Sequence, residues 1–87
     1  MQRIEGPLDF AHVHSWLAQS EDWLAGGRPL SLDLGGVTRC DSAGLALLLE
    51  LSRRCRDSGA QLQLSNAPQQ LRKLLSFYRL DDLLTLA

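Results

Sequence analysis

The stretch from residue 29 to residue 51, PLSLDLGGVTRCDSAGLALLLEL, limits the possible folds more than any other part of the sequence. Leucine occupies every second position of 30–34, an alternation typical of a β-strand. Two glycines follow and predict an interruption, and the next apolar run is long enough for a helix of about four turns. We therefore expect a strand over 30–34, a polar loop, and a buried helix from Ser42 to about Arg56.

Asp41 and Ser42 stand where this helix is expected to begin. Side chains of both types accept hydrogen bonds from the free N–H groups of a helix start, so both are candidate caps. The same N–H groups carry partial positive charge and favour a phosphate or a carboxylate. The polar loop 38–42 is therefore a candidate site, and helix capping alone is the alternative explanation.

The segment before this stretch predicts a strand and a helix. Residues 2–6 are extended at best, and the pair Gly6-Pro7 predicts their interruption. Asp9 is a candidate cap for a helix over about 10–25, which Gly26-Gly27 would end. The helix has one apolar stripe, with Ser20 among its members: Val13, Trp16, Leu17, Ser20, Trp23 and Leu24.

The segment after it predicts one more strand and one more helix. Residues 61–65 alternate in polarity, as a strand with one wet face does. Pro68 suits the start of a last helix, and residues 80–86 form a short apolar tail. The apolar side of that helix would carry Leu71, Leu74, Leu75 and Tyr78. We expect a single α/β domain, residues 1–87, in the order β-α-β-α-β-α with parallel βαβ units.

Composition excludes several classes of function. A net charge of −1 offers no general attraction for a polyanion, so we do not expect nucleic acid as a partner. No apolar segment reaches the roughly 18 residues of a membrane span, and the N-terminus does not resemble a signal peptide, so we expect a cytoplasmic protein without direct membrane insertion.

The residues that usually carry chemistry are few. Cys40 and Cys55 form no C-x-x-C pair, and His12 and His14 are two residues apart, so we expect reduced thiols and no metal site. Ser42 lacks the G-x-S-x-G setting of a nucleophile, and the glycine pair lacks the lysine of a phosphate-binding loop. We therefore expect no catalysis and no cofactor.

The segment LDLGGVTRCDSAGL, residues 32–45, resembles the central signature of STAS domains, the fold of anti-sigma-factor antagonists. Two weaker similarities flank it, EGPLD at 5–9 and GAQLQL at 59–64. The resemblance implies a small mixed sheet covered mainly on one side by helices, and a role in binding proteins. It also implies that Ser42 occupies the position that anti-sigma-factor antagonists phosphorylate.

Residues 37–51, VTRCDSAGLALLLEL, and the late segment LRKLLSFYRL at 71–80 are more similar to another branch of this family, the MlaB subunits of the phospholipid-transporting Mla ABC complex. That resemblance implies a non-catalytic subunit, peripheral to the inner membrane, that binds and supports an MlaF-like ATPase subunit and helps to maintain outer-membrane lipid asymmetry. The alternative is an anti-sigma-factor antagonist regulated by phosphorylation of Ser42, and a third hypothesis is a small-molecule or nucleotide binder.

The resemblance assigns the partner-binding surface to the loop, the helix start and nearby residues, which are Asp9, His12, Thr38, Arg39, Asp41 and Ser42. Arg39 would meet an acidic group of the ATPase, and Ser42 would both cap the helix and hydrogen-bond to the partner. Few residues precede Gly6, so we expect an open sheet edge that a partner covers or through which a homodimer forms.

Overall fold

A computed structural model describes residues 2–25, 29–84 and 86. Strands and helices alternate in the order β1 (Gln2–Leu8), α1 (Val13–Leu24), β2 (Leu30–Cys40), α2 (Ser42–Asp57), β3 (Leu62–Ser65) and α3 (Gln69–Phe77). The sheet order is β1-β2-β3, and both strand pairs are parallel. The α/β order predicted from the sequence is confirmed. The described strands form a parallel sheet, whereas the family resemblance implied a mixed one.

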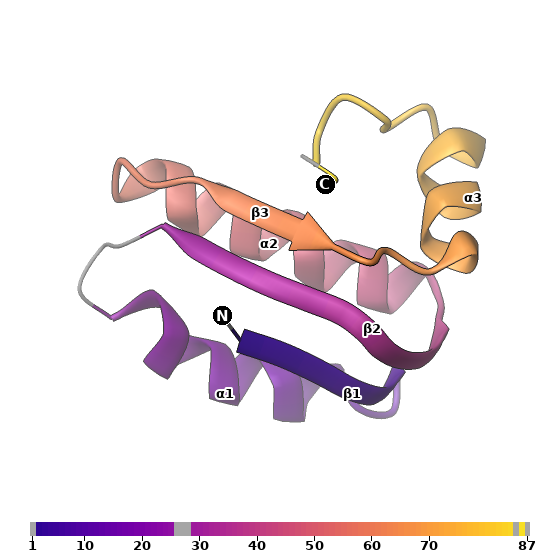
Figure 1. Cartoon of the computed structure of the whole chain (residues 1–87), viewed down its shortest axis with the longest axis horizontal. Coiled ribbons are helices and arrows are strands. Elements are labelled where there is room, and N and C mark those ends of the chain that lie inside the picture. The colour runs from indigo at the N-terminus through magenta and orange to yellow at the C-terminus, as the bar shows by residue number, and fades with distance from the viewer. Residues whose placement is uncertain (1, 26–28, 85, 87) are drawn as a thin grey trace.

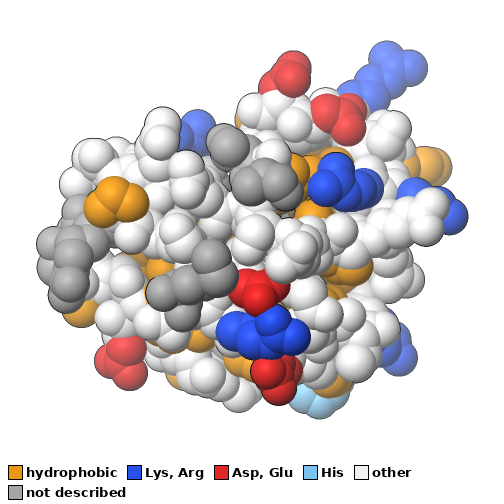
Figure 2. All heavy atoms as spheres, in the orientation of Figure 1, with side chains coloured by type: hydrophobic (Ala, Val, Ile, Leu, Met, Phe, Trp, Pro, Cys, Tyr) orange, Lys and Arg blue, Asp and Glu red, His pale blue; other side chains and the backbone are white. Residues whose placement is uncertain are grey.

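Helices α1 and α2 lie side by side behind the sheet, and α3 lies beyond the carboxyl end of β3 (Figure 1). The core fills the layer between the sheet and the two helices, and it includes Ile4 and Leu8 of β1, Leu32 and Leu34 of β2, Leu48 and Leu51 of α2, and Leu64 of β3. The other face of the sheet carries polar side chains, among them the paired charges of Arg3, Glu5 and Asp33 (Figure 2). The expected one-sided helical cover is therefore confirmed.

Strand β2 is longer than the predicted 30–34 and continues to Cys40. Its register with β1 shifts between Arg3 and Glu5 and again between Gly6 and Pro7, so that β2 bulges twice. Gly35 lies in the first irregular segment, where its N–H donates to Asp33 Oδ1 at 2.8 Å. The two glycines therefore mark a bulge within a strand instead of its end.

Strand β1 runs through the Gly6-Pro7 pair, so the predicted interruption is wrong. Gly6 adopts a φ of +92°, a conformation that glycine tolerates. Pro7 is accommodated because β1 is an edge strand, with β2 as its one neighbour among the described residues. Among the described residues β1 is an edge strand, and pairing of two copies through this edge remains a prediction.

Helix α1 starts at Val13, later than the predicted residue 10, because residues 9–12 form a separate turn. The backbone carbonyl of Asp9 accepts from the N–H groups of His12 and Val13, each at 3.0 Å. The predicted stripe is confirmed, since Ser20 is fully buried and the other members pack against the core. The predicted end at Gly26-Gly27 lies outside the described residues.

Helix α2 approaches β1 closely at Gly44. A Cβ atom built there would lie 2.1 Å from the carbonyl oxygen of Leu8, well inside van der Waals contact. Only glycine fits this position without movement of the helix or the strand. The contact brings the start of α2 against the end of β1, which places the two polar turns at that corner next to each other.

The last elements follow the prediction with small differences. Pro68 precedes α3 as its cap residue, Leu71 and Leu75 are buried, and Tyr78 is 48% exposed at the end of the helix. Leu86 pairs with Leu64 in a parallel bridge beside β3. None of the helices described for this chain is long and apolar enough to cross a membrane.

Candidate functional site

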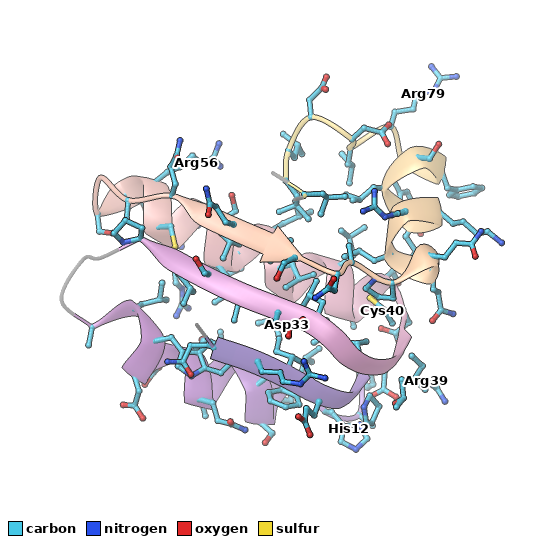
Figure 3. All side chains as sticks on the ribbon, in the orientation of Figure 1. His12, Asp33, Arg39, Cys40, Arg56 and Arg79 are labelled. Carbon is cyan, nitrogen blue, oxygen red and sulfur yellow. The ribbon has the colours of Figure 1, made fainter. Side chains whose placement is uncertain are left out.

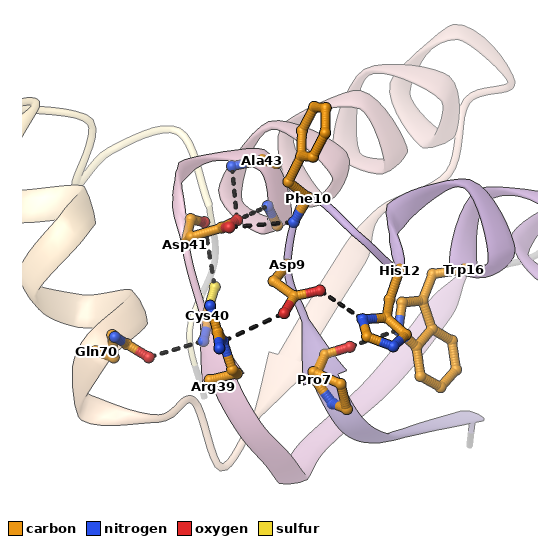
Figure 4. A network of polar contacts seen from close by, with 11 residues as sticks. Pro7, Asp9, Phe10, His12, Trp16, Arg39, Cys40, Asp41, Ala43 and Gln70 are labelled. Carbon is orange, nitrogen blue, oxygen red and sulfur yellow. Dashed lines mark hydrogen bonds and ion pairs between the residues drawn. The ribbon is translucent and has the colours of Figure 1, made fainter.

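Asp41 holds the turn between β2 and α2 in place. Its Oδ1 accepts from the N–H groups of Ala43 at 3.0 Å and Gly44 at 3.1 Å, as a helix cap does. Its Oδ2 accepts from the N–H group of Phe10 at 3.1 Å (Figure 4). One carboxylate therefore joins the start of α2 to the turn that follows β1.

These hydrogen bonds also fix the charge of Asp41. Burial alone would raise its pKa, but the N–H donors of Phe10, Gly44 and Ala43, together with the charge of Arg39, outweigh burial and lower the pKa. The carboxylate therefore stays ionised at neutral pH. A negative charge at the N-terminus of α2 stabilises the helix through its dipole.

Asp9 forms the second polar centre of this corner. Its side chain is 9% exposed, and its Oδ1 lies 2.6 Å from His12 Nδ1 while its Oδ2 lies 3.2 Å from Arg39 Nε. The predicted role of Asp9 as a side-chain cap of α1 is wrong, because this carboxylate instead holds two cationic or polar side chains at the surface. The side chains of His12 and Arg39 are 50% and 66% exposed.

Figures 3 and 4 show His12 and Arg39 at the same corner of the molecule. Arg56 and Arg79 point away from that corner (Figure 3). Trp16 of α1 also stabilises this corner, because its Nε1–H donates to the carbonyl of Pro7 at 3.0 Å. The turn that carries Asp9 and Phe10 is therefore fixed on both sides.

Ser42 is the first residue of α2, and its side chain is exposed. The capping role predicted for it is wrong, because the cap is Asp41. Ser42 is thus an exposed residue at a helix N-terminus. Thr38 and Arg39 are also exposed, but they belong to β2 and not to the loop that the sequence predicted.

Cys40 ends β2 beneath this surface. Its N–H donates to Gln70 Oε1 of α3 at 2.7 Å, and its thiol is buried. Burial, reinforced by the charge of Asp41, raises the pKa of the Cys40 thiol to about 11. A buried, protonated thiol is a packing group and a poor nucleophile.

The structure brings together four of the six predicted binding residues. Asp9, His12 and Arg39 are in direct contact, and Asp41 is linked to them through the backbone of Phe10. Ser42 and Thr38 are exposed and adjoin Asp41 and Arg39 in the chain, and among the described residues neither has a side-chain hydrogen bond to that group.

Sequence reasoning missed three residues of this corner, which are Phe10, Gly44 and Gln70. Phe10 is 77% exposed although its side chain is large and apolar. A signal for Gly44 was present, since a glycine in the first turn of an apolar helix often marks a close approach. Nothing in the sequence pattern indicated the exposure of Phe10 or the pairing of Gln70 with Cys40.

The side chains of this corner can donate and accept hydrogen bonds to another molecule. The Asp9–His12 pair resembles part of a catalytic triad, but no hydroxyl or thiol of the described residues hydrogen-bonds to His12. Within residues 2–25, 29–84 and 86, no group of three or more His, Cys, Asp or Glu side chains is placed to hold a metal ion. What the corner offers is a fixed set of exposed donors, an exposed hydroxyl and an exposed aromatic ring.

A sequence model described as "Mlab, STAS domain" matches residues 3–85. No curated protein matches the chain significantly.

Solved structures share the fold. A Thermotoga maritima protein described provisionally as an anti-sigma factor antagonist has a crystal structure with a TM-score of 0.82 at 20% identity, over 94% of this chain and 72% of that chain. Its NMR structure gives a TM-score of 0.77 at 18% identity, over 98% and 70% of the two chains. The murine Slc26a9 anion transporter in its inward-facing state matches with a TM-score of 0.75 at 26% identity, over 86% of this chain and 13% of that chain.

Proposed function

Because this chain belongs to the STAS domain family, through a family model that carries the name Mlab, we propose that it is a non-catalytic subunit that binds the ATPase of a phospholipid-transporting ABC complex. In this role it acts in the cytoplasm, at the inner membrane through its partner, and contributes to outer-membrane lipid asymmetry. The observation that supports the proposal most strongly is the exposed hydroxyl of Ser42 beside a polar network that is already fixed in the free chain.

Fixed surface groups favour binding because little conformational entropy is lost when a partner docks. Asp9 and Asp41 hold the backbone and the Arg39 side chain before any partner arrives. Arg39 presents a charged guanidinium for a carboxylate of the ATPase, and Ser42 presents a hydroxyl at the start of α2. Thr38 and His12 extend the same surface.

Co-purification from a cell extract tests this function. We expect the tagged chain to retain an ABC ATPase together with its permease. Replacing Ser42 with Thr keeps the hydroxyl and should keep binding, whereas Ser42→Asp adds a charge to the docking surface and should weaken binding about tenfold or more. Ser76→Asp is the matched control on α3, and binding within twofold of wild type is expected for it. Equal retention by Ser42→Asp and wild type would contradict the proposed role of this surface.

A second candidate function is that of an anti-sigma-factor antagonist whose Ser42 is phosphorylated. The exposure of Ser42 at the N-terminus of α2 favours it, because a kinase needs an accessible hydroxyl and a phosphate is stabilised by a helix start. Recovery of phosphate on Ser42, with an anti-sigma kinase in place of the ATPase in the co-purified material, would decide for this alternative.

A further inference from the structure

The pair Gly35-Gly36, which interrupts the apolar alternation of β2, lies beside one carboxylate. Asp33 Oδ1 accepts from the N–H of Gly35 at 2.8 Å, the short-range bond that an aspartate makes in an Asx turn. This bond lies in the first bulge of β2, where the register with β1 shifts between Arg3 and Glu5. Asp33 therefore accepts a backbone N–H at the point where the strand pairing becomes irregular.

The same carboxylate also links the three strands. Its Oδ1 accepts from Asn66 Nδ2, just after β3, at 3.0 Å, and its Oδ2 pairs with the guanidinium of Arg3 on β1. The hydrogen bonds from Asn66 and Gly35, followed by the charge of Arg3, outweigh desolvation and lower the pKa of this carboxyl group. The side chain is 16% exposed, and Figure 3 shows Asp33 on the sheet, away from the corner described above.

The two glycines leave room for these side chains. A Cβ atom at Gly35 would lie 3.1 Å from Asp33 Oδ1, and a Cβ atom at Gly36 would lie 2.8 Å from Cγ of Glu5. Both distances are shorter than ordinary contact, which begins at 3.4 Å. The glycine pair and the aspartate therefore act together to give β2 its bulged path at this point.

The bulged path decides which residue lies beside the end of β1. Arg3 lies opposite Asp33, so regular pairing from there would set Leu8 opposite Thr38. With the two bulges, Leu8 lies opposite Cys40 instead. The end of β2 is therefore placed by the bulges, and the first of them is the one that Asp33 holds.

This register matters to the proposed binding surface because Asp9 and Arg39 meet across it. Asp9 directly follows Leu8, Arg39 directly precedes Cys40, and Asp9 Oδ2 lies 3.2 Å from Arg39 Nε. A shift by one residue moves a strand by about 3.3 Å, which is enough to break a contact of this length. A loosened bulge would therefore separate the two side chains.

We infer that Asp33 is a positioning residue for this corner: its Oδ1, by accepting from Gly35, holds the first bulge of β2 and so keeps Arg39 beside Asp9. The inference rests on the proposed function for the role of the corner, whereas the effect of Asp33 on the register does not depend on that function. The ion pair with Arg3 has a smaller part, because Arg3 is 47% exposed and an exposed ion pair contributes little.

Three variants separate the acceptor oxygen from the charge. Asp33→Ala removes the acceptor, whereas Asp33→Asn keeps an acceptor oxygen and loses the charge that meets Arg3. Ser65→Ala is the matched control, since Ser65 lies opposite Asp33 on β3 and its hydroxyl donates to the carbonyl of Leu32 at 3.3 Å. This control removes a side-chain hydrogen bond next to Asp33 and leaves the bulge intact.

Two measurements are made on each variant. NMR spectroscopy of the isotopically labelled chain records the cross-strand NOEs between Leu8 and Cys40, which report the register directly. Titration calorimetry measures the affinity for the ATPase. Asp33 lies on the polar face of the sheet and outside the core, so each variant is expected to fold, which circular dichroism confirms first.

We expect Asp33→Ala to lose the NOEs between Leu8 and Cys40 and to bind the ATPase about tenfold more weakly. Asp33→Asn and Ser65→Ala should keep these NOEs and bind within about threefold of wild type. A purely stabilising role would lower the melting temperature of Asp33→Ala but leave its NOEs and its binding unchanged, and that result would overturn the inference.

Equal losses in Asp33→Asn and Asp33→Ala would also overturn the inference, because the charge and not the acceptor oxygen would then hold the register. Binding like wild type by a variant that has lost the NOEs would overturn it as well. If the wild-type chain does not bind the ATPase, the proposed function is overturned, and the NOEs alone then decide the inference in the same way.

Discussion

Replacement of Gly44 by alanine adds one methyl group at the tightest contact between a helix and a strand of this domain. The new Cβ would lie 2.1 Å from the carbonyl oxygen of Leu8 and 2.9 Å from its Cγ, whereas ordinary contact begins at 3.4 Å. The first turn of α2 and the end of β1 must therefore move apart by 3.4 − 2.1 = 1.3 Å. This movement would pull Asp41 away from Phe10.

Two effects of opposite sign decide the stability of this variant. Helix propensity alone favours alanine over glycine by about 1 kcal/mol. Overpacking costs about 1–3 kcal/mol, and a weakened hydrogen bond between Phe10 and Asp41 costs about 1 kcal/mol more. The sum predicts a free energy of unfolding that is lower by about 1–3 kcal/mol, so the close contact outweighs the helix propensity.

Urea unfolding followed by far-UV circular dichroism measures this difference. Ala46→Gly is the matched control, since it changes helix propensity at an exposed position of α2 and should destabilise by about 1 kcal/mol. A Gly44→Ala variant that is as stable as wild type, or more stable, would refute the reasoning, because propensity would then be the larger effect.

Two predictions concern the dependence of stability on pH. The pKa of Asp41 is lowered in the folded state, so the stability that its carboxylate contributes is complete above the unfolded pKa of about 3.9 and is lost as pH falls through the folded pKa. At pH 7, Asp41→Ala should lower the free energy of unfolding by about 1–2 kcal/mol. The melting temperature of the Asp41→Ala variant should approach that of wild type near pH 2. A difference in melting temperature that is equal at pH 7 and near pH 2 would contradict this prediction. The pKa of Cys40 is raised from 9.0 to about 11, so the stability that the buried thiol contributes below pH 9 is lost between pH 9 and 11. Between pH 9 and 11 the free energy of unfolding of Cys40→Ala, measured with urea, should rise relative to that of wild type by on the order of 2–3 kcal/mol, with Cys55 retained in both proteins. Parallel pH profiles of the two proteins would contradict this prediction.

The order of the elements could be predicted from the sequence because hydrophobic periodicity reports directly on burial. The alternation at Leu30, Leu32 and Leu34 and the stripe of α1 mark the sides that the structure buries. The ends of β1 and β2 could not be predicted, because a Gly-Gly or Gly-Pro pair suits a bulge or an edge strand as well as a loop. Which one forms depends on the neighbouring strand, and that pairing is not a local property.

The sequence predicted most residues of the candidate site, but not which of their side chains would pair with one another. Asp41 follows the local rule for helix caps, so its role could be expected. Asp9 and Arg39 are distant in sequence, and their pairing results from the parallel register that sets Leu8 beside Cys40. Ser42 and Asp41 are both good capping residues, and the position of the first helical turn, which the Gly44 contact restricts, decides between them.

The two bulges of β2 have a consequence for insertions and deletions. Between Ile4 and Leu8 the chain advances four residues on β1, and between Leu34 and Cys40 it advances six on β2, yet all four side chains face the core. The excess of two residues is taken up by the two bulges, each of which sets one extra residue of β2 against β1 and leaves the sides of the flanking residues unchanged. Losing one residue at either bulge would restore regular pairing there, with Leu34 and Cys40 still facing the core. The bulges are therefore the places where β2 can lose a single residue with the least change to the core.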